Sequence, residues 1–357
     1  MMKIVADENL AYTDFFFADI AEIQQLSGRT MTCDDTANAD ALLVRSVTKV
    51  NASLLEDSKI EFVGSATIGT DHLDLDYLHQ QHIGWANAAG CNAQAVAEYV
   101  ITALLHLHPE LLLHAESNFC LGIVGLGNVG RRLAYMADLL GWKVIGCDPF
   151  TQHDHIEQVT FDELLKCSDA ISIHVPLTHK GTDPTYHLFN TDAFRRMQAH
   201  CILINSARGP VVEEKALLAD LSHSKRQVVL DVFEHEPEIS EQLLDAVTLV
   251  TPHIAGYSLE GKARGTQMIY DAFCQHFHLE AKKDFRSQLP VAQHYFDEGA
   301  FKDVLATHLT QIYPIAEDDA RLRACIHDGK VDQAAFDQLR KHYPLRREWA
   351  AHGGPAA

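Results

Sequence analysis

The sequence predicts an α/β protein with two doubly wound parallel-sheet domains and a small α+β domain at the C-terminus. Short, continuously apolar runs alternate with helix-compatible polar stretches over residues 1–92, and the same alternation resumes after residue 118. Continuous apolar runs separated by helical stretches are typical of parallel strands covered on both faces. Near residue 285 the alternation stops and amphipathic stretches replace it, which indicates a third, separate region.

The first domain is predicted over residues 1–92, completed by residues 257–282. Ligands of open α/β sheets bind outside the carboxyl ends of the strands. Ser46 directly follows the second apolar run and Thr67 lies two residues after the third, so we expect both to contact substrate. The four runs predicted as strands are 3–7, 41–45, 61–65 and 83–87.

The second domain is predicted over residues 93–256. It begins with an apolar helix at 93–107, which Pro109 should end. A helical stretch from residue 257 to about residue 281 then returns to the first domain. The six strands predicted between these helices are 119–124, 143–147, 170–175, 201–205, 228–232 and 248–250.

The remaining residues, 285–357, are predicted to form a small C-terminal domain. Two amphipathic stretches, 300–313 and 334–343, are its main features. A small region appended to two complete domains more often mediates association than chemistry, so we expect it to mediate association.

Composition and charge exclude several classes of protein. The formal charge of −20, from 29 basic and 49 acidic residues, argues against nucleic-acid binding. No apolar run approaches the ~20 residues of a membrane helix, and the N-terminus lacks the pattern of a signal peptide. The eight cysteines form no CxxC pair and the 22 histidines form no HExxH motif, so no metal site is expected. We therefore expect a cytoplasmic protein with no membrane partner.

A glycine-rich motif, GLGNVG at 125–130, predicts a dinucleotide site. An apolar strand precedes the motif, a helical stretch follows it, and Asp148 closes the next strand. In this pattern Gly125 permits a tight turn, Gly127 lets the backbone approach the pyrophosphate, and Gly130 lets the helix pack on the strand. Asp148 can bind the ribose hydroxyls and would repel a 2′-phosphate, so the predicted cofactor is NAD.

Arg208 and His253 each follow an apolar run, where a buried strand should open into a loop. Arginine offers a planar fork that can hold a carboxylate. Histidine titrates closest to neutral pH and can take up a hydroxyl proton. A cation and a base placed in this way suit the oxidation of a 2-hydroxy acid.

A carboxylate should pair with the imidazole, and the segment DVFEHEP offers three glutamates. Glu234, Glu236 and Glu238 remain equal candidates on position alone. Asp231, directly at the strand end, is better placed to orient the nicotinamide end of the cofactor than to relay the proton.

The segments SARG, DVFEHEP and PHIAG, arranged behind GLGNVG, resemble the D-isomer-specific 2-hydroxyacid dehydrogenases over residues 1–282. The resemblance implies a flavodoxin-like substrate domain and a Rossmann NAD domain. It also implies that Arg208, Glu236 and His253 are catalytic, which favours Glu236 over its two neighbours.

Further segments, including VRSVTKVN, SATIGTDHLD and HIAGYSLEGKARGT, resemble one branch of that family. Members of that branch oxidise 4-phospho-D-erythronate with NAD in pyridoxine biosynthesis and form homodimers through the C-terminal domain. The resemblance implies that Ser46, Thr67 and Tyr257 contact substrate. The implied cofactor contacts are Gly125, Gly127, Asn128, Val129, Gly130, Asp148, Val175, Ala207, Asp231 and Gly256.

Two alternatives remain at this point. One is a dehydrogenase for glycerate, lactate or 3-phosphoglycerate; the other is a non-enzymatic NAD-sensing protein of the same fold. The substrate phosphate also needs cationic partners. Arg45 is one candidate, and a second hypothesis has Arg346 and Arg347 reaching the site of a partner subunit.

Overall fold

The computed structural model describes residues 1–112 and 119–355, which form two compact units. The first unit comprises Met1–Asn92 and Ser258–Val291, and the second comprises Ala93–Tyr257 and Ala292–Ala357. Among the described residues, no helix is both long and apolar enough to cross a membrane.

The first unit contains a five-stranded sheet with the order β2-β1-β3-β4-β5, in which every pairing is parallel. The edge strand β2 was missed from sequence because AEIQQL is only partly buried and lacks a continuous apolar run. The strands are β1 Met2–Asp7, β2 Ala21–Leu26, β3 Ala41–Val44, β4 Phe62–Ser65 and β5 Gly84–Asn87. The helices are α1 Thr13–Phe17, α2 Cys33–Thr36, α3 Ala52–Leu55, α4 Leu75–Gln80, α11 Leu259–His276 and the 3₁₀ turn η3 Phe285–Gln288.

The second unit contains a seven-stranded parallel sheet with the order β12-β11-β10-β9-β6-β7-β8. The six predicted strands are all present in this sheet, which confirms the predicted doubly wound arrangement. The two-residue edge strand β8 was not predicted. The strands are β6 Cys120–Val124, β7 Lys143–Cys147, β8 Glu157–Gln158, β9 Ala170–Ile173, β10 Ile202–Asn205, β11 Val228–Leu230 and β12 Leu249–Val250.

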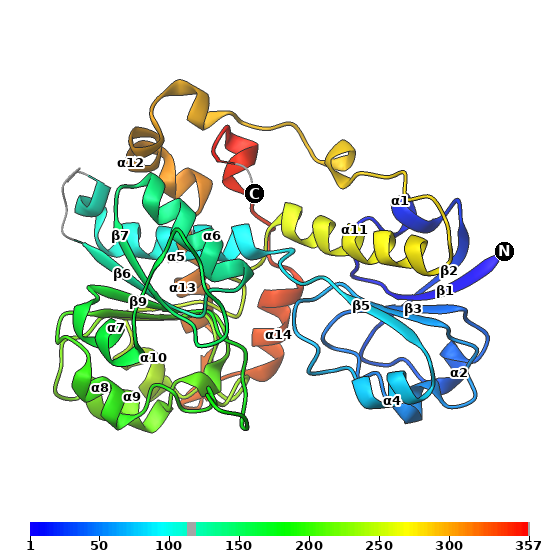
Figure 1. The fold of residues 1–357 in the computed structure, drawn as a ribbon, viewed down its shortest axis with the longest axis horizontal. Helices are drawn as coiled ribbons and strands as arrows, with labels where there is room; N and C mark the ends of the chain where they lie inside the picture. The colour runs from blue at the N-terminus through cyan, green and yellow to red at the C-terminus, as the bar shows by residue number, and fades with distance from the viewer. Residues whose placement is uncertain (113–118, 356–357) are drawn as a thin grey trace. The chain divides into compact units, whose positions relative to one another are not determined.

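Helices cover both faces of this sheet (Figure 1), and alternate strand side chains enter two separate cores. In β10, for example, Ile202 and Ile204 join the core under α5 and α6, while Leu203 joins the core under α7 to α10. The helices are α5 Ala93–Leu107, η1 Pro109–Leu112, α6 Asn128–Leu139, α7 Phe161–Cys167, α8 Thr191–Arg196, η2 Gly209–Val211, α9 Glu214–Leu221 and α10 Glu241–Ala246.

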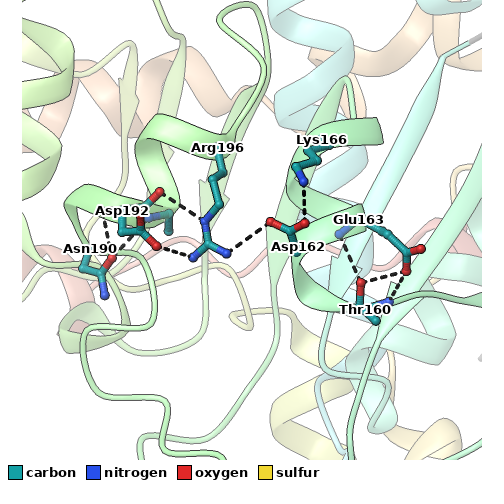
Figure 2. Close-up of polar contacts among 8 residues, drawn as sticks. Thr160, Asp162, Glu163, Lys166, Asn190, Asp192 and Arg196 are labelled. Carbon is teal, nitrogen blue, oxygen red and sulfur yellow. Dashed lines mark hydrogen bonds and ion pairs between the residues drawn. The ribbon is translucent and has the colours of Figure 1, made fainter.

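Capping and ion pairs fix the ends of α7 and α8 (Figure 2). Thr160 and Glu163 form a reciprocal capping box at the start of α7, and Asn190 caps α8. Arg196 of α8 bridges Asp192, at 2.7 Å, and Asp162 of α7, at 3.2 Å. These exposed pairs add little stability singly, but they tie together two helices that cover the same face of the sheet.

The C-terminal segment packs into both cores of the second unit. Trp349 and Ile312 lie in the core under α5 and α6, whereas Leu322 and Phe336 lie in the core under α7 to α10. A short antiparallel hairpin gives the segment its α+β character. Its elements are η4 Tyr295–Glu298, α12 Phe301–Ile312, α13 Ile315–Arg323, β13 Ile326–His327, β14 Lys330–Val331, α14 Gln333–Lys341 and η5 Trp349–His352.

Arg346 binds this segment to the first turn of α5 and to the residues after β12. Its guanidinium donates to the carbonyls of Tyr257 at 2.7 Å, Ala95 at 2.5 Å and Ala255 at 2.9 Å. It also lies 4.4 Å from the centre of the Tyr313 ring. The hypothesis that Arg346 reaches a partner subunit is therefore wrong, because its guanidinium is buried within its own chain.

Glu98 of α5 is buried beside Arg346, and its carboxylate accepts hydrogen bonds from Gln94 at 2.6 Å and from the Trp349 N–H at 2.7 Å. Burial and the nearby Glu348 carboxylate raise the pKa of Glu98 to about 8. The fold therefore favours the protonated form of this side chain. An acid whose pKa rises on folding makes the protein progressively less stable as the pH climbs from the unfolded pKa to the raised value, because only the unfolded chain loses the proton in that interval.

We expect the thermal unfolding midpoint to fall between about pH 4.5 and about pH 8, with Glu98→Gln reducing that fall. Glutamine keeps the hydrogen-bonding shape but cannot ionise. Calorimetry of both proteins across this range measures the effect, and Glu280→Gln, an exposed acid on the first unit, is the control. Parallel pH profiles for wild type and Glu98→Gln would contradict the expectation.

Candidate active site

The glycine loop between β6 and α6 leaves room for a ligand at one residue and none at the other two. Gly125 has a φ of +93°, and a side chain there would meet the carbonyl oxygen of His174 at 2.6 Å. A side chain at Gly130 would meet the Gly125 carbonyl oxygen at 2.0 Å. At Gly127, the N-cap of α6, no atom of the described residues other than those of Gly127 and its two chain neighbours lies within 4 Å of that position. An uncapped helix start with open space beside it fits a dinucleotide pyrophosphate.

Asp148, after β7, organises the same loop. Its carboxylate accepts hydrogen bonds from the backbone N–H groups of Leu126 at 2.8 Å and Phe150 at 2.9 Å. Burial opposes the charge, but these hydrogen bonds outweigh it and lower the pKa of Asp148. An ionised acid at this place fits ribose hydroxyls and disfavours a phosphate, in agreement with NAD rather than NADP.

His253 and Glu236 form a hydrogen-bonded pair, with 2.8 Å between His253 Nδ1 and Glu236 Oε1. Burial opposes ionisation of Glu236, but the hydrogen bond and the charge of His253 lower its pKa. Because a carboxylate only accepts, the pair requires the proton on Nδ1 and leaves Nε2 of the neutral ring as an acceptor. That arrangement suits a general base.

Glu234 has different partners. Its carboxylate lies 2.5 Å from His187 Nε2 and accepts the Glu214 N–H at 2.7 Å, and Glu238 is exposed. Geometry therefore distinguishes the three glutamates, which position in the sequence alone did not.

Asp231 shapes the loop that carries His253. Its buried carboxylate accepts hydrogen bonds from the Thr251 hydroxyl at 2.6 Å and from the backbone N–H groups of Ile254 at 2.7 Å and Ala255 at 2.9 Å. Burial raises the pKa of Asp231 to about 6, although the nearby His253 and these donors oppose the shift. The bonds hold His253 at a φ of 57°, a left-handed conformation that is unfavourable for a side chain with a Cβ.

Arg208 follows β10 in a turn that Asn205 closes. The Asn205 side chain accepts the Ala207 N–H at 3.1 Å and donates to the Arg208 carbonyl at 2.9 Å. The next residue, Gly209, is pressed against the segment after β11, since a side chain there would meet the Phe233 carbonyl oxygen at 1.9 Å. This close approach fixes the Arg208 turn against the loop that leads to Glu236.

The predicted substrate contacts of the first unit follow its strands as expected. Ser46 is exposed after β3, and the Thr67 hydroxyl, after β4, lies 2.9 Å from the Ser65 hydroxyl. Arg45, a candidate for the substrate phosphate, is already paired with the buried Asp7 at 3.2 Å. That ion pair reduces the charge Arg45 can offer to an anion.

Comparisons with known proteins agree with this geometry. Residues 106–255 match the D-isomer specific 2-hydroxyacid dehydrogenase NAD binding domain, and residues 285–352 match a domain of unknown function. Erythronate-4-phosphate dehydrogenase of Acinetobacter baylyi is 66% identical over the full length of both chains. The chain belongs to the erythronate-4-phosphate dehydrogenase family.

The enzyme of that name from Psychrobacter cryohalolentis is 45% identical, over 98% of this chain and 97% of its own. Among solved structures, NAD-dependent formate dehydrogenase from Staphylococcus aureus in complex with NAD has the same fold, with a TM-score of 0.63 and 24% identity over 79% of this chain and 98% of its own. The predicted fold class, family and NAD cofactor are confirmed.

Within this erythronate-4-phosphate dehydrogenase family member, the predicted cofactor residues share one edge of the seven-stranded sheet. Parallel strands place their carboxyl ends at the same edge. The residues after β6, β7, β9, β10, β11 and β12 are Gly125, Gly127, Asn128, Val129, Gly130, Asp148, Val175, Ala207, Asp231 and Gly256. Their individual contacts to NAD stay predictions.

Sequence reasoning missed the residues whose side chains hold the site residues in place. Asn205 and Thr251 stand inside the motifs already noted, so their position next to Arg208 and His253 was the available signal. Arg340 of α14 lies 3.9 Å from Glu236, but it is more than 100 residues away in sequence and no motif marks it.

We expect Asp148→Ala to raise KM for NAD at least about tenfold and to narrow the preference for NAD over NADP. The substitution removes an ionic hydrogen-bond acceptor of the ribose, worth about 1.5–3 kcal/mol, and frees two loop N–H groups. Steady-state kinetics with each cofactor measures the change, and Asp154→Ala, an exposed acid nearby, is the control. An unchanged cofactor preference would contradict the assignment.

Proposed function

We propose that this protein oxidises the 2-hydroxyl of 4-phospho-D-erythronate to (R)-3-hydroxy-2-oxo-4-phosphooxybutanoate, a step of pyridoxine 5′-phosphate biosynthesis. Full-length identity of 66% to an erythronate-4-phosphate dehydrogenase supports the substrate. The observation that supports the chemistry is the His253–Glu236 pair, which leaves Nε2 of the ring as an acceptor on the sheet edge that carries the dinucleotide loop.

In the proposed reaction His253 takes the proton of the 2-hydroxyl, and the Glu236 carboxylate stabilises the resulting imidazolium. NAD, when bound, accepts the hydride that leaves carbon 2. Arg208 holds the substrate carboxylate with its planar guanidinium. Ser46, Thr67 and Tyr257 are proposed as further substrate contacts, on the resemblance of their motifs.

The test is NADH formation with 4-phospho-D-erythronate, D-lactate, D-glycerate and 3-phosphoglycerate, each with a carbonyl trap that draws the oxidation forward. We expect the highest kcat/KM for 4-phospho-D-erythronate. Preference for another of these acids would overturn the proposed substrate. Binding of NAD without turnover of any of them would favour the alternative, an NAD-sensing binding protein.

We also propose that the protein is a cytoplasmic homodimer that associates through residues 285–357. Support comes from the resemblance of this region to the dimerisation domain of the same branch. All eight cysteines are free thiols, as is usual in a reducing compartment. Sedimentation of the full chain should give twice the chain mass, and hydrogen exchange above and below the dissociation concentration should locate the interface. A monomer at all concentrations, or protection elsewhere, would refute the proposal.

A further inference from the structure

Arg340 of α14 brings a largely buried cation from the C-terminal segment to the proposed proton-transfer pair. Its Nη1 lies 3.9 Å from Glu236 Oε1, the same oxygen that lies 2.8 Å from His253 Nδ1. The Arg340 side chain is 24% exposed and that of Glu236 is 19% exposed. At this depth charges interact more strongly than they do on the surface.

The surroundings hold Arg340 in this place. Asp332 caps α14 by accepting the Ala335 N–H at 2.7 Å, and Phe336 anchors the helix in the core. The Arg340 guanidinium lies 5.7 Å from the centre of the Phe336 ring. Its buried Nε has no hydrogen-bond partner among the described residues. A donor left unpaired in this way costs free energy, so stability alone does not account for an arginine here.

The charged and titratable groups around Arg340 are those of the proposed site. Burial opposes its charge, but Tyr257, Glu236 and Asp231 act electrostatically to raise the pKa of Arg340, and the Tyr257 side chain is a hydrogen-bond partner. The guanidinium therefore remains a cation at any pH at which the enzyme would operate. Of these neighbours, Glu236 pairs with His253, and Tyr257 is a proposed substrate contact.

We infer that Arg340 is a positioning residue that holds Glu236 and offsets part of its charge, and so limits how strongly Glu236 favours the protonated form of the His253 imidazole. The C-terminal segment would then set the working pH of the reaction in addition to its proposed part in association. This inference rests on the proposed function, in which His253 accepts the hydroxyl proton.

The direction of the effect follows from the charges. Glu236 favours the protonated imidazole, whereas a cation beside Glu236 disfavours it. Neutralising Arg340 should therefore move the protonation midpoint of His253 to higher pH, by on the order of 0.5 pH unit for a partly screened charge. Arg340→Met keeps most of the packing volume, Arg340→Gln is a second neutral replacement, and Arg340→Lys keeps the charge.

The decisive measurement is a proton NMR titration of the His253 ring in histidine-labelled protein, with the resonance identified by its loss in His253→Ala. The titration needs no substrate, so it measures the effect of Arg340 on His253 even if the proposed substrate is wrong. We expect an upward shift in Arg340→Met and Arg340→Gln and a smaller shift in Arg340→Lys. Lys341→Ala, the adjacent exposed cation on α14, carries the same change in charge and should leave the midpoint unchanged.

Kinetics supply the second measurement. In Arg340→Met the acid limb of the kcat/KM profile should move to higher pH by the same amount as the His253 midpoint. At pH values on this limb kcat/KM should then be about threefold lower than in wild type, whereas the high-pH plateau should stay within about twofold of wild type. An unmoved His253 midpoint in both neutral variants would overturn the inference. So would a loss of rate that is equal at every pH and accompanies a lower unfolding temperature, because that pattern indicates a structural role alone. Wild type that turns over none of the four acids would instead refute the proposed function.

Discussion

Replacing His253 with alanine is expected to lower kcat by a factor of about 10² to 10⁴, the usual contribution of a general base. The loss should fall on kcat, because the imidazole acts on the hydroxyl proton and contributes less to ground-state binding. Rates of NADH formation at saturating substrate measure the change, and NADH fluorescence checks that cofactor binding persists.

His235→Ala is the matched control for this prediction. His235 is exposed in the same loop that carries Glu236, and it is expected to tolerate the change with kcat within about twofold of wild type. A His253→Ala enzyme with near-wild-type kcat would refute the assignment of the base. Equal losses in both variants would point to disruption of the loops instead.

Removing the guanidinium in Arg208→Ala is expected to raise KM and to lower kcat together. Leaving a desolvated carboxylate without its charged partner costs about 2–5 kcal/mol, which corresponds to a fall of about 30- to 4000-fold in kcat/KM. Arg208→Lys should recover only part of this loss, since an ammonium cannot reproduce the planar fork.

Steady-state kinetics with 4-phospho-D-erythronate test Arg208, and Arg195→Ala, an exposed cation on α8, is the control for the lost charge. If Arg208→Lys equals wild type, the residue supplies charge without bidentate geometry. If Arg208→Ala leaves KM and kcat unchanged, Arg208 does not bind the substrate.

Much of the fold could be read from the sequence because its signals are local. A buried parallel strand must be apolar along its whole length, which marked the central strands of both sheets. The edge strands β2 and β8 escaped because a partly buried edge does not require that pattern. The glycine loop was likewise marked locally, since its glycines stand in one six-residue motif and a side chain at Gly130 would meet the carbonyl of Gly125, five residues away.

The site was predictable to the extent that strand ends define it. Arg208, Asp231 and His253 each follow a strand, and parallel strands deliver their ends to one edge. Glu236 lies further along a loop, so its pairing with His253 depended on how that loop folds back. A position in a loop does not specify a direction, which is why three glutamates remained equal candidates on position alone.

The sequence by itself determined the α/β class, the dinucleotide loop, the acid after β7 and the residue types needed for 2-hydroxy acid oxidation, because each depends on neighbours along the chain. The tertiary structure alone decided that Glu236 pairs with His253, that Asp231 holds the His253 loop, and that the C-terminal segment shares both cores of the second unit. It also brought Arg340 to Glu236 and buried Arg346. These contacts join residues far apart in sequence, and only packing of the whole unit brings such residues together.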